Sequence, residues 1–291
     1  MGTHLKVSVA IPACNEEKYV AGCLNALLHQ TFADFEIIVV NDHSTDSTAN
    51  IVGSFHDERI RCFTNESGLG IAKSANRSLG LCRGDYVFFT DADCTVAKDW
   101  IEQGLKMLEG SDLAGVEGKI VYVSENYQPT YSDQAMGSYG PGQYRGASVA
   151  YRRSIVQSVG GFDERYTYMH DRNLALKVLR SGGKMGFNER MIAYHPPLRP
   201  SIKEFVQTAN RVTNKLYLFK EFRDRRNMVW RIVYPKNMFA ILFPPAVLLI
   251  VFLHKFRKWD DFKLIPFIYP RIVYERFCLW RQCIRERVFL V

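Results

Sequence analysis

The sequence predicts an α/β fold in which helices flank a doubly wound, mostly parallel sheet, with a helical C-terminal appendage. Over the first 200 residues, apolar runs of strand length alternate with segments of helical periodicity, and the connections between them are short. Hydrophobic residues make up 47% of the chain and charged residues 23%, which excludes a disordered polypeptide. Beyond Pro196 the composition becomes basic and apolar, so we expect a catalytic domain over 1–200 and a separate region over 201–291.

The first half of the chain supplies most of the predicted sheet. Residues 5–11 alternate and then run apolar up to Pro12, which indicates a buried strand. Residues 16–29 carry apolar side chains at a spacing typical of a helix. The same two patterns then alternate, which predicts strands at 35–42, 60–63 and 85–93 and helices at 49–55 and 70–82.

The second half continues the alternation around a long loop. Residues 115–123 read as one or two strands, and a stretch rich in Gly, Ser and Tyr follows them. The strand-like sequence GASVAYRR then leads into a helix at 154–159 and a Gly-Gly turn. A helix over 171–180 and a last strand over 184–195 complete the predicted domain.

Acidic and amide side chains follow several of the predicted strands at their carboxyl ends. In open α/β sheets, ligands bind outside this edge. Asp91 and Asp93 lie two positions apart after one strand, and carboxylates this close repel each other unless a cation lies between them. An isolated Asp-x-Asp is more often a solvated turn, so the meaning of this motif depends on its context. In a ligand site the pair predicts a Mn²⁺ or Mg²⁺ ion that neutralises a diphosphate leaving group.

The order of the motifs supplies that context. Residues 8–48 contain P-x-x-N-E and V-V-N-D-x-S-T-D, and residues 68–93 contain G-x-A-x-x-x-N and the Asp-x-Asp pair. In this order the motifs resemble family 2 glycosyltransferases of the GT-A type, and the block 146–195 resembles the acceptor half of the same fold. The resemblance covers about 5–200. It implies an inverting enzyme that transfers a sugar from a nucleoside diphosphate sugar, most often a UDP-sugar, to a hydroxyl of a glycan or a lipid-linked acceptor.

The resemblance places several residues in the nucleotide pocket. Pro12, Asn15 and Glu16 are expected to line it, and Asp42 to bind the uracil or ribose edge, where a carboxylate accepts hydrogen bonds. The alternative for Asp42 is the N-cap of the following helix. Lys73 matches a position that approaches the pyrophosphate, and its alternative is a solvated helix lysine.

The resemblance also assigns the reacting groups. Asp171 matches the aspartate of the family's Glu-Asp pair and is expected to be the general base, which with in-line attack implies inversion. The preceding glutamate is His170 here, a departure that leaves the second carboxylate's role open and points to a different acceptor. Asp91 and Asp93 are the expected metal ligands. His195 is a further candidate ligand, with a structural strand-end histidine as the alternative.

Two further residues are candidates for the donor site. Gly161 is expected in a turn that forms a wall of the donor-sugar pocket, or else serves only a tight backbone conformation. Arg211 is expected to reach the diphosphate, or else to contact lipid or solvent. Cys94, beside Asp93, is expected to be a small buried filler.

Three other functional classes were weighed against the glycosyltransferase. A sugar-phosphate nucleotidyltransferase would have a glycine-rich loop with an arginine after its first strand, whereas PACNEE follows it here. A nucleic-acid-binding protein is excluded because no recognised motif accompanies the basic residues. A non-catalytic carbohydrate- or partner-binding relative stays open, although the combination of Asp91, Asp93 and Asp171 argues against it.

The positive charge of the chain is concentrated near its C-terminus. The net charge is +8, yet residues 211–291 hold 17 Lys and Arg against 6 Asp and Glu. Residues 238–253 lack charge but are too short for a straight crossing and contain two prolines, so an interfacial segment or a kinked hairpin is expected. Residues 264–291 interleave apolar residues and arginines, as an amphipathic helix on an anionic membrane does. The alternative is a helical subdomain or a homo-oligomer interface.

The cysteines bear on the compartment. There are seven, an odd number, and no Cys-x-x-Cys occurs, so neither a disulfide framework nor a zinc site is indicated. We also see no secretory signal, because an apolar strand begins almost at once. We therefore expect a cytoplasmic protein associated with the cytoplasmic face of the cell membrane.

Overall fold

The protein divides into two compact units, one of Met1–Glu125 with Tyr139–Pro196 and one of Asn126–Ser138 with Pro197–Val291. The computed structural model describes residues 5–122, 141–196, 201–222 and 265–287. The assignment of 1–200 and 201–291 as separate domains remains a proposal.

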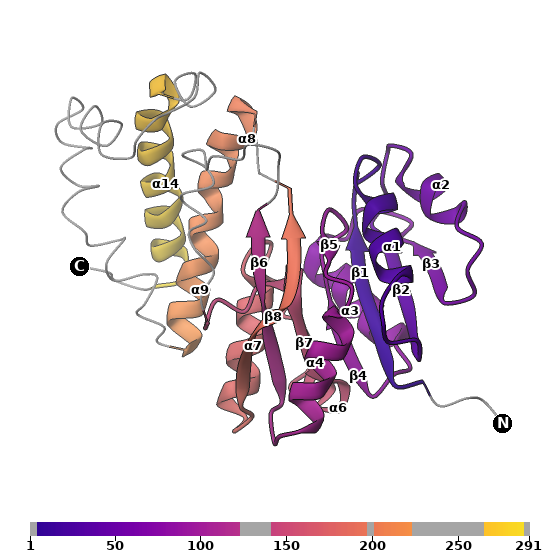
Figure 1. The fold of residues 1–291 in the computed structure, drawn as a ribbon. Helices are drawn as coiled ribbons and strands as arrows, with labels where there is room; N and C mark the ends of the chain where they lie inside the picture. Colours follow the sequence, from indigo (N-terminus) through magenta and orange to yellow (C-terminus); the bar gives the residue numbers. More distant parts are fainter. Residues whose placement is uncertain (1–4, 123–140, 197–200, 223–264, 288–291) are drawn as a thin grey trace. The chain divides into compact units, whose positions relative to one another are not determined.

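Eight described strands of the first unit form one sheet in the order β3-β2-β1-β4-β7-β6-β8-β5 (Figure 1). They are β1 (Val7–Ala13), β2 (Phe35–Asn41), β3 (Ile60–Thr64), β4 (Tyr86–Phe89), β5 (Thr95–Val96), β6 (Gly115–Tyr122), β7 (Val149–Arg152) and β8 (Met185–His195). Strands β1 to β4 pair in parallel, as do β6 and β8. Strand β7 runs antiparallel to β4 and β6, and β5 runs antiparallel to β8. The predicted mostly parallel α/β sheet is therefore confirmed.

Helices cover both faces of this sheet because its strands bury alternate residues on opposite sides. Val9, Ile11 and Ile37 belong to one core, whereas Ala10 and Ile38 belong to the other. The first core takes buried side chains from α1 (Val20–Leu28), α2 (Thr48–Gly53) and α4 (Trp100–Glu109). The second core takes them from α3 (Ile71–Leu81), α6 (Arg153–Ser158) and α7 (His170–Arg180).

Sequence reasoning did not predict helix α4 or strand β5. Helix α4 buries Trp100, Ile101, Leu105 and Leu108 against the sheet, and this spacing of apolar residues is a recognisable helical signal. Strand β5 has two residues and, among the described strands, pairs with β8 alone, so no local pattern could have revealed it. Both elements lie directly after the Asp-x-Asp motif and contribute to the position of His195.

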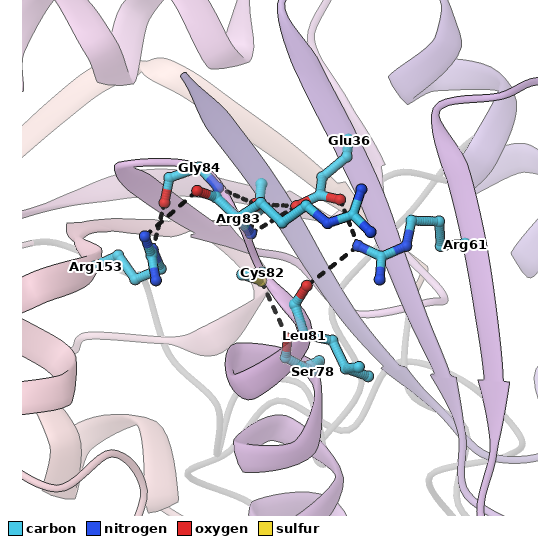
Figure 2. A network of polar contacts seen from close by, with 9 residues as sticks. Glu36, Arg61, Ser78, Leu81, Cys82, Arg83, Gly84 and Arg153 are labelled. Carbon is cyan, nitrogen blue, oxygen red and sulfur yellow. Dashed lines mark hydrogen bonds and ion pairs between the residues drawn. The ribbon is translucent and has the colours of Figure 1, made fainter. Parts of the chain in front are cut away.

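A buried polar network ties the sheet together at the amino ends of its strands, away from the carboxyl-end edge (Figure 2). Glu36 on β2 accepts hydrogen bonds from the Ser8 hydroxyl at 2.8 Å and the Arg83 backbone N–H at 2.7 Å. Arg61 on β3 forms an ion pair with the other oxygen of Glu36 at 2.7 Å and also donates to the Leu81 carbonyl. The network joins three neighbouring strands to the turn before β4, which fixes the register that brings their carboxyl ends level.

The described part of the second unit consists of α8 (Ile202–Gln207), the 3₁₀ turn η2 (Thr208–Arg211), α9 (Val212–Phe222) and α14 (Ile265–Arg285). Ser201 and Glu204 form a capping box that starts α8. Arg271 of α14 stacks on the Phe205 ring at 4.5 Å and donates to the Thr208 hydroxyl at 2.9 Å. These contacts join α14 to α8 and η2.

The outer face of α14 is strongly apolar. Phe277 is 57% exposed, Trp280 53% and Ile284 79%, whereas Ile272 and Leu279 are buried on the opposite side. Within the described residues, no helix is both long and apolar enough to cross a bilayer. The segment 238–253, for which an interfacial position was predicted, lies outside the described residues.

Candidate active site

The Asp-x-Asp motif lies at the carboxyl end of β4, next to the end of β8. Strand β5 pairs with β8 so that Thr95 faces Tyr194, which brings His195 beside Asp93. One possible ligand atom from each of Asp91, Asp93, Cys94 and His195 lies within 4.8 Å of the others. The predicted meeting of the two carboxylates and His195 is therefore present in the fold, and a strand that sequence reasoning missed produces it.

The hydrogen bonding of His195 determines which ring nitrogen faces this cluster. Its Nδ1 lies 2.6 Å from the carbonyl oxygen of Pro196, which only accepts, so Nδ1 carries the proton. Its Nε2 lies 3.5 Å from an oxygen of Asp93. In the neutral ring Nε2 therefore presents a lone pair toward the carboxylates, the arrangement of a metal-ligating histidine held by a backbone carbonyl.

The chemistry of these side chains suits a hard divalent cation. Carboxylate oxygens are the protein ligands that Mn²⁺ and Mg²⁺ prefer, and an imidazole is an acceptable further ligand for Mn²⁺. Burial, followed by the negative charge of Asp93, raises the pKa of Asp91 above its ordinary value. Cys94 is fully buried, and this burial raises the pKa of its thiol, so Cys94 is a packing residue as expected rather than a thiolate ligand.

Asp171 lies in the first turn of α7, and both it and Asp91 lie near Gly146. The Gly146 backbone N–H donates to Asp171 Oδ2 at 2.8 Å, and the Arg172 N–H donates to Oδ1 at 2.7 Å. A Cβ placed on Gly146 would lie 3.8 Å from Asp171 Oδ2 and 3.9 Å from Asp91 Oδ1. Sequence reasoning missed Gly146, which marks where the acidic motif and the candidate base come together.

Two buried charged side chains support the loop that ends at Gly146. Glu117 of β6 is 3% exposed and accepts backbone hydrogen bonds from Gly142 at 2.8 Å and from Tyr144. Arg172, also buried, donates to the Gly142 carbonyl at 3.1 Å. Burial raises the pKa of Glu117, although the backbone donors oppose the shift. The sequence signal that could have indicated this supporting role is a glutamate within the strand sequence GVEGK.

The loops after β1 and β2 bind each other through Asn15 and Glu16. Asn15, in the left-handed region at φ 59, accepts the Thr45 N–H at 2.8 Å, and the Glu16 N–H donates to the Thr48 hydroxyl at 2.7 Å. Burial, Asp93 and Asp91 together raise the pKa of Glu16 to about 7. The Glu16 carboxyl group therefore belongs to the same acidic cluster as the Asp-x-Asp pair.

Asp42 organises the approach to α3. Its carboxylate accepts hydrogen bonds from the Asn65 side chain at 2.7 Å and from the N–H groups of Leu69 and Gly70 at 2.8 Å. Burial acts to raise the pKa of Asp42, but these donors outweigh it and the pKa is lowered. Asp42 does not cap α2, whose N-cap is Ser47 without a side-chain bond, so the N-cap alternative is wrong.

The other predicted residues fall in different places. Lys73 is exposed on α3, and Arg211 is exposed on η2 in the second unit. Gly161 has φ +62, and a Cβ on it would lie 2.6 Å from the Asn76 side-chain oxygen, so this glycine is required where the turn packs on α3. The structure therefore agrees with the alternative for Gly161, in which this glycine serves a tight backbone conformation.

A cavity opens between the acidic motif and α7. Its walls are mostly apolar, with the carboxylates of Asp91 and Asp171 at one end. The lining residues are Pro12, Ala75, Phe89, Thr90, Asp91, Gly146, Val149, Tyr151, Phe162, His170, Asp171 and Leu174. Of the predicted residues, it brings Pro12, Asp91 and Asp171 together.

Comparison with known proteins shows extensive similarity to sugar-transferring enzymes. The chain is 29% identical over 208 residues to the amylovoran biosynthesis glycosyltransferase AmsB of Erwinia amylovora, covering 65% of this chain and 67% of that protein. It is 29% identical over 120 residues to the Escherichia coli UDP-Glc:alpha-D-GlcNAc-diphosphoundecaprenol beta-1,3-glucosyltransferase WfgD. That match covers 41% of this chain and only 47% of WfgD. A match to Streptococcus pneumoniae GlyG, 31% identical, spans 40% of GlyG, so the chain aligns with less than half of these two relatives.

Solved structures share the fold. The complex of Staphylococcus aureus TarS with UDP superposes with a TM-score of 0.60 at 18% identity, covering 99% of this chain and 93% of that one. The Pyrobaculum calidifontis mannosyltransferase PcManGT, bound to GDP-Man and Mn²⁺, superposes with a TM-score of 0.62 at 18% identity, covering 98% and 88%. The model of glycosyl transferase family 2 matches residues 8–181. The family expected from the motif order is thus confirmed: this chain belongs to glycosyl transferase family 2.

Proposed function

We propose that the protein is a metal-dependent, inverting glycosyltransferase that uses a UDP-sugar. The observation that carries this proposal is the position of Gly146, where an added Cβ would lie within 4 Å of the carboxylates of both Asp91 and Asp171. A candidate cation site and a candidate base therefore border the same space, where a leaving group and an attacking hydroxyl would both have a partner.

Asp91, Asp93 and His195 would hold Mn²⁺ or Mg²⁺ in this site. When bound, the cation supplies positive charge to the diphosphate as it leaves. The imidazole of His195 contributes a lone pair because the Pro196 carbonyl keeps the ring proton on Nδ1. The raised pKa of Asp91 supports the assignment, because a bound cation would offset both the burial and the repulsion by Asp93 that raise it.

Asp171 is proposed to accept the proton of the acceptor hydroxyl. The two N–H groups that donate to its carboxylate fix the orientation of its oxygens. As the proton moves to Asp171, the acceptor oxygen bonds to the anomeric carbon and the bond from that carbon to the diphosphate oxygen breaks. One base and one displacement on opposite faces of the sugar produce inversion.

Pro12, Asn15, Glu16, Asp42 and Lys73 are proposed to form the nucleotide side of the site. For Asp42 the space for a ligand is limited, because Oδ1 already accepts two hydrogen bonds and Oδ2 accepts one. A carboxylate oxygen accepts two donors, so Oδ2 retains room for one uracil or ribose donor. Gly161 and Arg211 remain proposals for the donor site on the resemblance alone.

The proposed acceptor is a hydroxyl of a glycan or of a lipid-linked sugar, and the proposed location is the cytoplasmic face of an anionic membrane. The name of WfgD describes a lipid-linked acceptor, which supports the proposal by similarity. The outer face of α14 supports it physically, because it combines exposed Phe277, Trp280 and Ile284 with exposed Arg281 and Arg285. Aromatic and basic side chains on one helix face suit an interface between lipid tails and anionic headgroups.

A nucleotide-sugar hydrolysis screen tests the catalytic proposal. Purified protein is incubated with UDP-glucose, UDP-galactose, UDP-N-acetylglucosamine and GDP-mannose, with Mn²⁺, with Mg²⁺ or with EDTA. Release of UDP from at least one donor, dependent on the cation, is expected. Calorimetric binding of these donors without turnover would instead support a non-catalytic relative, and turnover unaffected by EDTA would exclude the metal role.

Flotation with anionic liposomes tests the membrane proposal. The full chain should float with phosphatidylserine vesicles at low salt, and Phe277→Glu should reduce the floating fraction severalfold. Leu179→Glu is the matched control, because Leu179 is an exposed leucine on α7 in the first unit. Equal flotation of the two variants, or none by the unmodified chain, contradicts membrane contact through α14. A dimer that Phe277→Glu dissociates would support the oligomer alternative.

A further inference from the structure

Two residues that line the cavity beside Asp171 each carry a buried polar atom without a partner among the described residues. These atoms are the hydroxyl of Tyr151 and Nδ1 of His170. Tyr151 is 1% exposed, so bulk water does not hydrate its hydroxyl. A buried polar group without a hydrogen bond costs about 1–3 kcal/mol, and such groups in native proteins call for an explanation.

Specific contacts hold these two side chains in the lining of the cavity. Tyr151 lies on β7 opposite Gly115, and a Cβ on Gly115 would lie 2.5 Å from the Tyr151 ring, so glycine is needed there to admit it. His170 is the first residue of α7, and its ring lies 5.5 Å from that of Phe162. Both side chains line the same cavity as Asp91 and Asp171.

The rest of the cavity lining shows which chemistry it suits. Phe89 and Phe162 contribute aromatic rings whose centroids are 5.1 Å apart, and Ala75 and Leu174 contribute aliphatic surface. The Thr90 hydroxyl is already used, since it donates to the Ala147 carbonyl at 3.0 Å. The residues with unpartnered polar atoms are therefore few and belong to a mostly apolar lining, the composition typical of small-ligand pockets.

We infer that Tyr151 and His170 form a specificity-determining subsite that binds one polar ring substituent of the transferred sugar. The substituent must both donate and accept a hydrogen bond, which a sugar hydroxyl and an amide group both do. The apolar C–H face of the same ring would pack against Phe162. This inference rests on the proposed function and adds to it the residues that choose the donor sugar.

The protonation states of the two side chains fit such a substituent. Burial lowers the pKa of His170, although the nearby Asp171 opposes this, so the ring is neutral near pH 7. A neutral Nδ1 either donates or accepts, depending on the tautomer, and a tyrosine hydroxyl does both. His170 also stands where the family pattern has a glutamate, and a neutral imidazole removes a negative charge from beside Asp171.

The test uses four donors that differ at two positions of the ring. UDP-glucose, UDP-galactose, UDP-N-acetylglucosamine and UDP-N-acetylgalactosamine vary the C2 substituent and the C4 configuration independently. Tyr151→Phe should lower kcat/KM for the preferred donor about tenfold, the value of one neutral hydrogen bond, and change the poorest donor less than twofold. If Tyr151→Phe no longer distinguishes donors that differ at one ring carbon, C2 or C4, the substituent on that carbon is the one that the subsite binds.

Stability separates this role from a structural one. Since the Tyr151 hydroxyl has no partner in the described protein, Tyr151→Phe should leave the Tm unchanged or raise it. A fall in Tm of several degrees with unchanged donor selectivity would overturn the inference, because it would show a structural partner. Tyr86→Phe is the control, since the Tyr86 hydroxyl accepts from Arg152 at 3.3 Å outside the cavity.

His170 provides an independent arm of the test. Asparagine places a polar atom near the position of Nδ1, so His170→Asn should keep donor selectivity whereas His170→Leu should lose it. Equal selectivity of the two variants and the unmodified protein would overturn the assignment of His170. Absence of turnover by the unmodified protein with every donor would refute the proposed function itself, an outcome distinct from turnover with unaltered selectivity.

Discussion

Replacing Asp171 by asparagine tests the proposed base while preserving the shape of the site. The carboxylate now accepts the Gly146 N–H on Oδ2 and the Arg172 N–H on Oδ1. An asparagine offers one oxygen and one NH₂ group, so only one of these two N–H donors keeps an acceptor. The substitution therefore removes the proton acceptor and also one hydrogen bond that holds the site.

The two effects differ in size and are measured separately. Loss of general-base assistance should lower the rate of transfer or hydrolysis by about 10²–10⁴-fold. Loss of one acceptor for a partly buried N–H should cost about 1–2 kcal/mol of the free energy of unfolding, or roughly 3–6 °C in Tm. Donor affinity should change less than about threefold, because the base contacts the attacking hydroxyl rather than the nucleotide.

The assay pairs three measurements on Asp171→Asn and the unmodified protein. Calorimetry gives donor affinity in the presence of Mn²⁺, UDP release gives the rate at saturating donor, and thermal unfolding gives Tm. A rate within tenfold of the unmodified protein would refute Asp171 as the base. A loss of rate accompanied by an equal loss of donor affinity would show that Asp171 serves binding.

Three further results are expected. Asp93→Ala should abolish turnover, and Asp91→Ala should reduce it at least a hundredfold, measured as UDP release over a Mn²⁺ titration. Full activity of either variant in excess chelator would contradict the metal site. Asp42→Ala should raise KM for the donor with little change in kcat, whereas a large fall in kcat at unchanged affinity would contradict a nucleotide-binding role. The pKa of Glu16 is raised to about 7 in the folded protein, whereas in the unfolded chain Glu16 loses its proton near the ordinary glutamate pKa of about 4.5. Between these two pH values the folded state binds more protons than the unfolded state, so the metal-free protein should lose stability as pH rises from about 4.5 to 7. Glu16→Gln should flatten this decline in Tm, and an unchanged pH profile would show that Glu16 is not its source.

Much of the catalytic half was predictable from local sequence. The strands that bury alternate residues and the helices α1, α3 and α7 were predicted because hydrophobic periodicity reports directly which face of an element packs inward. The Asp-x-Asp pair was predictable for a related reason, since it immediately follows a buried strand and must lie at the carboxyl end of the sheet. Helix α4 carried the same kind of signal in Trp100 and Leu108, and the failure to predict it was avoidable.

The precise composition of the site depended on contacts between distant segments. His195 reaches Asp93 through the pairing of β5 with β8, and Gly146 lies close to both Asp91 and Asp171 because Glu117 and Arg172 hold its loop. None of these distances follows from the spacing of residues along the chain, since packing sets them over separations of many tens of residues. The unpartnered hydroxyl of Tyr151 shows the difference most clearly. In the sequence, Tyr151 is simply one residue of a predicted strand. Its hydroxyl is deprived of water and of a protein partner by the surrounding elements α3, β4 and α7, because burial is a property of the whole fold.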